Sequence, residues 1–181
     1  DPRRISFGLK QAIASPVKII EQINPTTLAK SRKTAEQADF VRATMEQDGA
    51  ALCEFYAWFE NALGKERITE LTIDEKLSAQ RAKRPGYISP SFATIAGFAA
   101  NGALPHYRAT EAAHLEIQGE GLLLIDSGGQ YLGGTTDITR VWPIGSVTEE
   151  QKRDYTLVLK GMIALSRTSF PRGTKSPMLD A

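Results

Sequence analysis

The stretch that decides the fold reads Gly121-Leu-Leu-Leu-Ile-Asp126-Ser-Gly-Gly-Gln-Tyr131-Leu-Gly-Gly-Thr-Thr136-Asp137-Ile-Thr-Arg140-Val-Trp-Pro143. An apolar run leads into Asp126, glycines follow, and β-branched and aromatic residues come after Asp137. This pattern predicts a β-hairpin. A tight turn at Tyr131 and Leu132 would set the two carboxylates nearly opposite, with Cβ atoms about 4.5–5.5 Å apart. Like charges so placed destabilise a hairpin, so we expect a cation between them, and a divalent metal ion is the natural candidate.

Paired aspartates are open to other interpretations when the residues are considered alone. They could share a proton as an acid–base dyad, serve as two glycosidase carboxylates, bridge metal ions, or lie as exposed turn residues. Asp126 ends the apolar run Leu122-Leu-Leu-Ile125, which predicts a position near the core. An unpaired charge is unfavourable there, and this favours a bound partner over an exposed turn.

The rest of the chain predicts helices around this hairpin. Residues 1–30, punctuated by prolines, are expected to be the tail of a preceding domain and a linker, and residues 31–181 a second domain. Capping-box patterns predict helices from Thr34 to about Leu63, from Thr72 to Arg84, and from Thr148 to about Thr168. Alternation over residues 89–96 predicts one strand, and the last helix is expected to bury its apolar face. The order fits an α+β domain with an antiparallel sheet covered by helices.

Composition narrows the class of protein. The 181 residues carry a net charge of +1, so no strong field points to nucleic acid or to an anionic membrane. No run of 18 apolar residues is present, so the sequence predicts no transmembrane helix. The one cysteine, Cys53, cannot form an internal disulfide, which fits a reducing compartment and predicts a cytoplasmic protein.

The hairpin resembles the metal-binding hairpin of the pita-bread metallopeptidases, a family that includes methionine aminopeptidase, prolidase and Xaa-Pro aminopeptidase. The sequence Gly134-Thr-Thr-Asp-Ile-Thr-Arg140 most resembles the corresponding segment of the Xaa-Pro aminopeptidases (aminopeptidase P). The segment Asn101-Gly-Ala-Leu-Pro-His-Tyr107 resembles the loop that carries that family's substrate-facing histidine. The resemblance covers about residues 28–181 and implies that residues 31–181 are an incomplete pita-bread metallopeptidase domain, its first half, in a chain truncated at both ends.

The resemblance also implies a site and a reaction. Asp126 would bind one metal ion, Asp137 would bridge two, and His106 would hydrogen-bond the substrate. The two divalent ions would be manganese by first choice, with zinc or cobalt as alternatives. The implied activity is hydrolysis of the bond before a proline in second position, with the remaining metal ligands beyond this chain. Prolidase activity, a non-catalytic peptide-binding module and a homodimer stay open.

Overall fold

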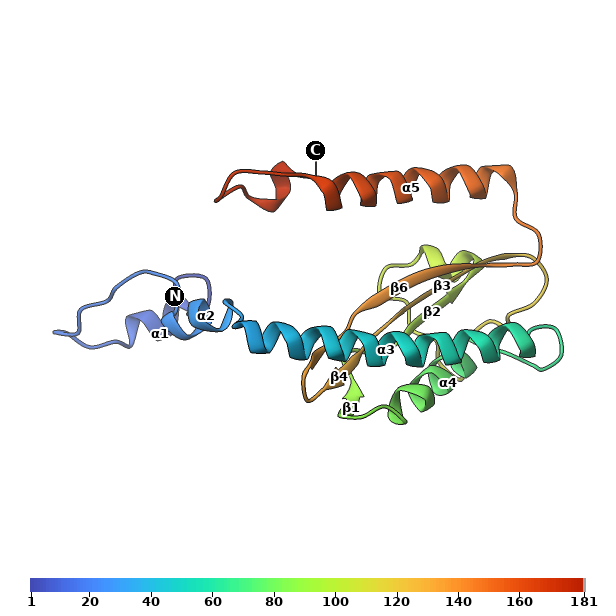
Figure 1. The fold of residues 1–181 in the computed structure, drawn as a ribbon. Helices are drawn as coiled ribbons and strands as arrows, with labels where there is room; N and C mark the ends of the chain where they lie inside the picture. The colour runs from blue at the N-terminus through green and yellow to red at the C-terminus, as the bar shows by residue number, and fades with distance from the viewer. Residues whose placement is uncertain (181) are drawn as a thin grey trace.

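The computed structural model describes residues 1–180 and has helices arranged about two small antiparallel sheets (Figure 1). The helices are α1 (Phe7–Gln11), α2 (Pro25–Lys30), α3 (Ala35–Ala62), α4 (Glu70–Ala82), α5 (Glu149–Arg167) and the 3-10 turns η1 (Ala99–Ala103) and η2 (Ser176–Met178). The strands are β1 (Tyr87–Pro90), β2 (Ile95–Phe98), β3 (Gly121–Ser127), β4 (Gly129–Tyr131), β5 (Gly134–Thr135) and β6 (Ile138–Ile144). The predicted α+β class is confirmed.

The predicted hairpin runs through both sheets. The part farther from the turn is the ladder between β3 and β6, and β2 pairs with the other edge of β3, which gives the order β2-β3-β6. Its tip continues as β4 and β5, which pair with β1 in the order β1-β4-β5. The hairpin thus joins the two sheets, and successive side chains along each of its strands lie on opposite faces.

One face of β3 forms the core. Leu123 and Ile125 are fully buried on it, whereas Leu122 and Leu124 on the other face are only half-buried. Helices α3 and α4 pack on the buried face, as Figure 1 shows. The other buried members of this core include Phe55, Phe59, Ile68, Ile73, Leu77, Phe98, Ile117 and Ile144. Each such side chain stabilises the fold by about 1.5–3 kcal/mol through burial.

The first long helix begins where its capping box predicts, and the second does not. At α3, Thr34 and Gln37 cap each other reciprocally. At α4, the predicted start at Thr72 is wrong, because Thr69 is the cap and Thr72 is its partner inside the helix. Thr69 forms an isolated bridge to Glu116, which holds it extended and lets the helix begin at the next residue.

The single strand predicted for residues 89–96 is two strands in different sheets. β1 ends at Pro90 and pairs with β4, whereas β2 starts at Ile95 and pairs with β3. Between them, the Ser91 amide donates to Gly128 O at 3.1 Å and its hydroxyl donates to Thr136 O at 2.9 Å. These bonds turn the chain from one sheet to the other at the point where β3 gives way to β4.

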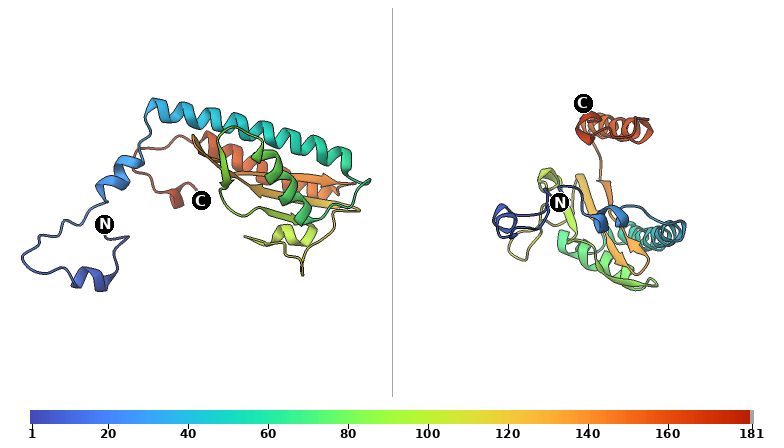
Figure 2. Two further views of the ribbon diagram at one scale, coloured as in Figure 1. Left: turned by 90° about the horizontal axis from the view of Figure 1, so that it is seen from below. Right: turned by 90° about the vertical axis from the view of Figure 1, so that its left-hand side faces the viewer.

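Helix α5 forms as predicted but stands away from the core (Figure 2). The expectation that its apolar face is buried is wrong for the described residues, because none of the side chains of α5 is buried. Its exposed apolar side chains include Tyr155, Val158, Leu159, Met162, Ile163 and Leu165. Across residues 1–180, none of the helices combines the length and apolarity needed to cross a membrane.

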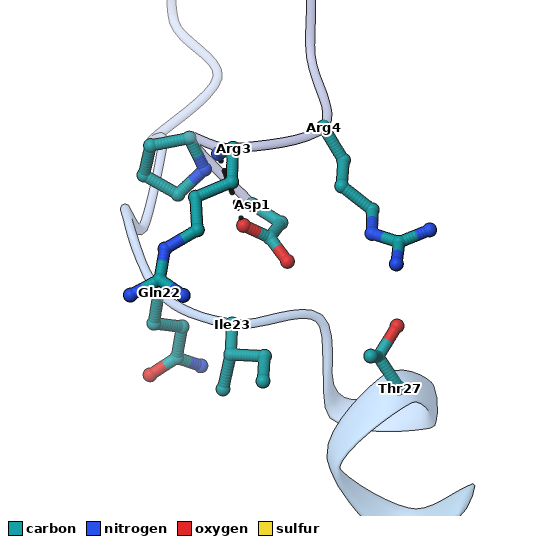
Figure 3. Close-up of a pocket in the computed structure, with 7 residues that line it drawn as sticks. Asp1, Arg3, Arg4, Gln22, Ile23 and Thr27 are labelled. Carbon is teal, nitrogen blue, oxygen red and sulfur yellow. Dashed lines mark hydrogen bonds between the residues drawn. The ribbon is translucent and has the colours of Figure 1, made fainter. Parts of the chain in front are cut away.

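The N-terminal segment lies outside the core. Helices α1 and α2 contain no buried residues, and the chain around them forms a pocket of about 920 Å³ (Figure 3). This pocket is lined by Asp1, Pro2, Arg3, Arg4, Gln22, Ile23 and Thr27. None of these residues belongs to the hairpin, so the pocket is separate from the predicted site. The division of the chain at residue 30 stays a prediction.

Candidate metal site

Asp126 lies on the face of β3 that points away from α3 and α4. Its residue is half-buried, and its neighbours on that face are Leu122 and Leu124. The Oδ1 atom of Asp126 is buried, and no hydrogen-bond partner for it exists in residues 1–180. Buried carboxylate oxygens are ordinarily hydrogen-bonded, so an unpaired one calls for an explanation such as a missing ion.

Asp137 does not lie directly opposite Asp126, which corrects the predicted geometry. The cross-strand partner of Asp126 is Thr139, and Asp137 directly precedes β6. The centre of the turn therefore falls between Leu132 and Gly133, one residue later than predicted. Asp137 lies two residues before Thr139, the spacing at which strand residues share a face. A diagonal pair of this kind has a separation of about 7–8 Å, which leaves room for an ion between exposed Asp137 and half-buried Asp126.

The backbone between the two aspartates is held tightly. A Cβ atom at Gly128 would lie 2.0 Å from Thr136 O, so only glycine fits there. The Gly129 amide donates to Thr136 Oγ1 at 2.8 Å, and the Thr136 amide donates to Gly129 O at 2.9 Å. Since Gly128 follows Asp126 by two residues and Thr136 precedes Asp137, these contacts fix the two carboxylate-bearing segments relative to each other.

A buried ion pair beneath the hairpin anchors its tip. Asp48 on α3 accepts from Arg81 Nε at 2.7 Å and from Arg81 Nη2 at 3.1 Å, and the Tyr131 hydroxyl donates to Asp48 at 2.7 Å. Burial by itself raises the pKa of Asp48, but the Arg81 and Tyr131 hydrogen bonds outweigh it, and the pKa lies below its usual value. We call Asp48, Arg81 and Tyr131 the buried anchor. The sequence pattern did not predict it.

His106 lies in the loop that follows η1, and its side chain is exposed. Tyr107 N donates to Leu104 O at 3.2 Å, and His106 has φ +58°, which with Pro105 before it makes a type II turn. The 3-10 turn before it lies on the Asp126 face, because a Cβ at Gly102 would be 3.0 Å from Gly97 O and 3.7 Å from Leu124 Cβ. The η1 turn that leads to His106 and the Asp126 carboxylate thus share one face of the sheet.

The donor set suits a hard divalent cation but does not enclose one. Two carboxylates with an unpaired buried oxygen offer the oxygen ligands that Mn²⁺, Mg²⁺ or Ca²⁺ prefer. No group of three or more His, Cys, Asp or Glu side chains within residues 1–180 is arranged to hold a metal ion. The aspartates therefore fit part of a metal site.

Curated proteins similar to this chain include several described as probable Xaa-Pro aminopeptidase P. A probable Xaa-Pro aminopeptidase P of Coccidioides posadasii is 39% identical over 180 residues, which is 98% of this chain and 30% of that protein. A probable Xaa-Pro aminopeptidase P of Sclerotinia sclerotiorum is 41% identical over the same length, again 98% of this chain and 30% of the relative. The chain thus spans less than a third of the relatives it matches.

Solved structures agree with the sequence relatives. The X-prolyl aminopeptidase of Caenorhabditis elegans, a cytosolic enzyme with a di-nuclear active site, superposes with a TM-score of 0.80 at 34% identity, over 86% of this chain and 26% of that one. The prolidase of Pyrococcus furiosus superposes with a TM-score of 0.70 at 25% identity, over 86% and 44%. The α+β fold described above is therefore a part of the pita-bread fold.

The family model of the metallopeptidases matches most of the chain. It aligns with residues 39–181, from the first turns of α3 to the last residue, and includes the whole hairpin. Because the match takes in both sheets and both aspartates, the chain belongs to metallopeptidase family M24.

Proposed function

We propose that this chain supplies part of the active site of a metal-dependent exopeptidase that removes the N-terminal residue preceding proline. The observation that carries the proposal is the buried Oδ1 atom of Asp126, which has no hydrogen-bond partner within residues 1–180 and lies in a strand paired with β6, the strand that directly follows Asp137. Similarity to Xaa-Pro aminopeptidases over 98% of the chain supports the choice of substrate. A single cysteine and the cytosolic relative from C. elegans support a cytoplasmic location.

Asp126 and Asp137 would hold divalent metal ions, for which manganese is our first choice and zinc or cobalt are alternatives. When bound, such ions polarise a carbonyl and lower the pKa of water toward neutrality. Asp126 would bind through the oxygen that lacks a protein partner, and Asp137, exposed at the start of β6, would approach from solvent. The remaining ligands would come from outside residues 1–180.

His106 would bind the substrate from the loop after η1. Its exposed imidazole is free to donate a hydrogen bond to a carbonyl oxygen, and a donor aimed at that oxygen stabilises the charge that develops during peptide hydrolysis. The turn from Leu104 to Tyr107, closed by the hydrogen bond from Tyr107 N to Leu104 O, would present the ring to the substrate. His106 would therefore contact the substrate, whereas Asp126 and Asp137 would contact the metal ions.

Calorimetric titration with Mn²⁺ tests the site directly. We expect the unmodified chain to bind Mn²⁺, and Asp126→Asn and Asp137→Ala each to weaken that binding. The control is Asp74→Asn, which removes an exposed carboxylate of α4 on the opposite side of the sheet. Equal Mn²⁺ binding by all four proteins would remove the proposed metal site.

A second experiment addresses the substrate, because a prolidase is among the similar structures. In a chimera, this chain would replace the matching 180 residues of the Coccidioides relative. We expect the chimera to release the first residue of an Xaa-Pro-Yaa tripeptide faster than it cleaves an Xaa-Pro dipeptide. The reverse preference would identify a prolidase, and a folded, metal-loaded chimera without activity would favour a non-catalytic module.

A further inference from the structure

Glu70 is a buried carboxylate that the proposed chemistry does not use. It is the first residue of α4, and it is 1% exposed. Its Oε1 atom accepts from Phe98 N at 2.8 Å and from Asn101 Nδ2 at 3.0 Å. Its Oε2 atom accepts from the Tyr107 hydroxyl at 2.8 Å and from Leu115 N at 2.8 Å. A buried carboxylate that accepts hydrogen bonds from four groups fixes the positions of the segments that carry those groups.

The donors come from both ends of the loop that carries His106. Phe98 ends β2, Asn101 lies in η1, Tyr107 follows His106 directly, and Leu115 lies beyond the loop. Asn101 Nδ2 also contacts Oε2 of Glu70 at 3.2 Å and the Tyr107 hydroxyl at 2.9 Å. The carboxylate thus gathers the beginning, middle and end of the loop at one point.

We propose that Glu70 is a positioning residue, which holds the His106 turn over the sheet face that carries Asp126. The inference rests on the proposed function, since it concerns the place of His106 relative to a metal bound at the aspartates. The path from Glu70 to His106 is short: one hydrogen bond to Tyr107 and one peptide bond. The path from Glu70 to the Asp126 face runs through η1, which lies against Leu124.

The role requires a carboxylate and no other group of its size. An ionised carboxylate only accepts hydrogen bonds, and all of its partners here are N–H or O–H donors. Glutamine has nearly the same shape but replaces one acceptor oxygen with an NH₂ group. In one orientation that group would face the Phe98 amide and in the other the Leu115 amide, and both are donors. Glu70→Gln would therefore release one side of the loop while leaving the core volume unchanged.

Mn²⁺ provides a test within this chain, because it broadens the NMR signals of nuclei near it. In the unmodified chain, we expect Mn²⁺ to broaden the signals of Asp126 and Asp137 and also those of the His106 ring. In Glu70→Gln, we expect the aspartate signals to stay broadened and the His106 signals to lose their broadening. Glu75→Gln, an exposed substitution on the same helix, should behave as the unmodified chain. Tyr107→Phe removes only the hydroxyl link and should weaken the His106 effect without loss of the fold.

Each outcome has one meaning. Unchanged broadening of His106 in folded Glu70→Gln and in Tyr107→Phe would overturn the positioning role, although the metal site would stand. If Glu70→Gln does not fold, Tyr107→Phe decides alone. Equal loss of broadening at Asp126 and His106 would assign Glu70 to general stability and overturn the inference. No broadening at the aspartates of the unmodified chain would instead refute the proposed function, and the inference with it.

Discussion

The carboxylates of Asp48 and Asp126 have different surroundings. Asp48 lies beneath the tip of the hairpin, and Asp126 lies in β3, on the face that points away from α3 and α4. Asp48, in the buried anchor, is fully buried and has a bidentate arginine and a tyrosine hydroxyl as partners. Asp126 is half-buried and has one oxygen out of contact with solvent and without a partner. Side chains of this chain supply hydrogen-bond donors to both oxygens of Asp48, whereas Oδ1 of Asp126 has no partner within residues 1–180.

The difference distinguishes a carboxylate that stabilises the fold, Asp48, from one that suits a metal ligand, Asp126. A paired buried charge holds elements together, here α3, α4 and β4, because Asp48 lies on α3 and its partners Arg81 and Tyr131 come from α4 and β4. An unpaired buried oxygen destabilises the chain on its own and is tolerated where something else binds. Substitutions at the two carboxylates should therefore change stability in opposite directions.

The largest effect is expected at the buried anchor. Asp48→Asn would leave the Arg81 guanidinium, itself 1% exposed, without a counter-charge, and we expect it to lower the free energy of unfolding by about 3–5 kcal/mol. Urea denaturation followed by circular dichroism measures this. The control is Glu54→Gln, which breaks the pair between α3 and Arg84 where the Glu54 side chain is 53% exposed, and should cost about 0–1 kcal/mol. Equal losses in the two variants would contradict the assignment.

A smaller loss is expected when only the tyrosine link is cut. Tyr131→Phe removes the hydroxyl that donates to Asp48 but keeps the ring against Tyr87 and keeps the Arg81 pair. A hydrogen bond to a charged group contributes about 1.5–3 kcal/mol, so the loss should lie in that range and below that of Asp48→Asn. The same denaturation experiment measures it. A loss as large as that of Asp48→Asn would mean that the ring, not the hydroxyl, holds the hairpin.

A change in the free energy of unfolding of the opposite sign is expected at Asp126. Without metal, Asp126→Asn should raise the free energy of unfolding by about 1 kcal/mol, because it removes a charge that is partly out of water and unpaired. Added Mn²⁺ should raise the melting temperature of the unmodified chain and not that of the variant, since a ligand stabilises only the state that binds it. Destabilisation by Asp126→Asn in the absence of metal would show that Asp126 is paired in solution, as Asp48 is.

The sequence predicted what local chemistry determines. Capping boxes at Thr34 and Thr148 located the starts of two helices, and the glycine-rich stretch between apolar runs located the hairpin. Its register came out one residue off, because the Leu-Gly-Gly tip fits more than one turn. The split of residues 89–96 depends on Ser91 bonds to Gly128 and Thr136, which local alternation does not contain.

The buried anchor was missed because its members are far apart along the chain, although signals existed. Arg81 follows Ile73 and Leu77 at four-residue spacing on the buried face of α4, and Asp48 fills the gap in the apolar stripe of α3. Charges on two such faces predict a pair. Glu70 gave no comparable signal, because its donors are backbone amides and loop side chains whose positions only the folded chain defines.

The smallest effect is expected at high pH, where the Glu70 cluster can be compared with the anchor. Burial, with help from the hydrogen bond to Glu70, raises the pKa of Tyr107 from 10.0 to about 12. Because the folded chain holds this proton more tightly than the unfolded chain, the stabilisation is complete below about pH 10 and is lost as pH rises from there through about 12. The difference in urea midpoint between the unmodified chain and Tyr107→Phe should therefore shrink between about pH 8 and about pH 11. A difference that stays constant over that range would mean that the Tyr107 hydroxyl does not donate to Glu70, and the loop around His106 would then be held by Phe98, Asn101 and Leu115 alone.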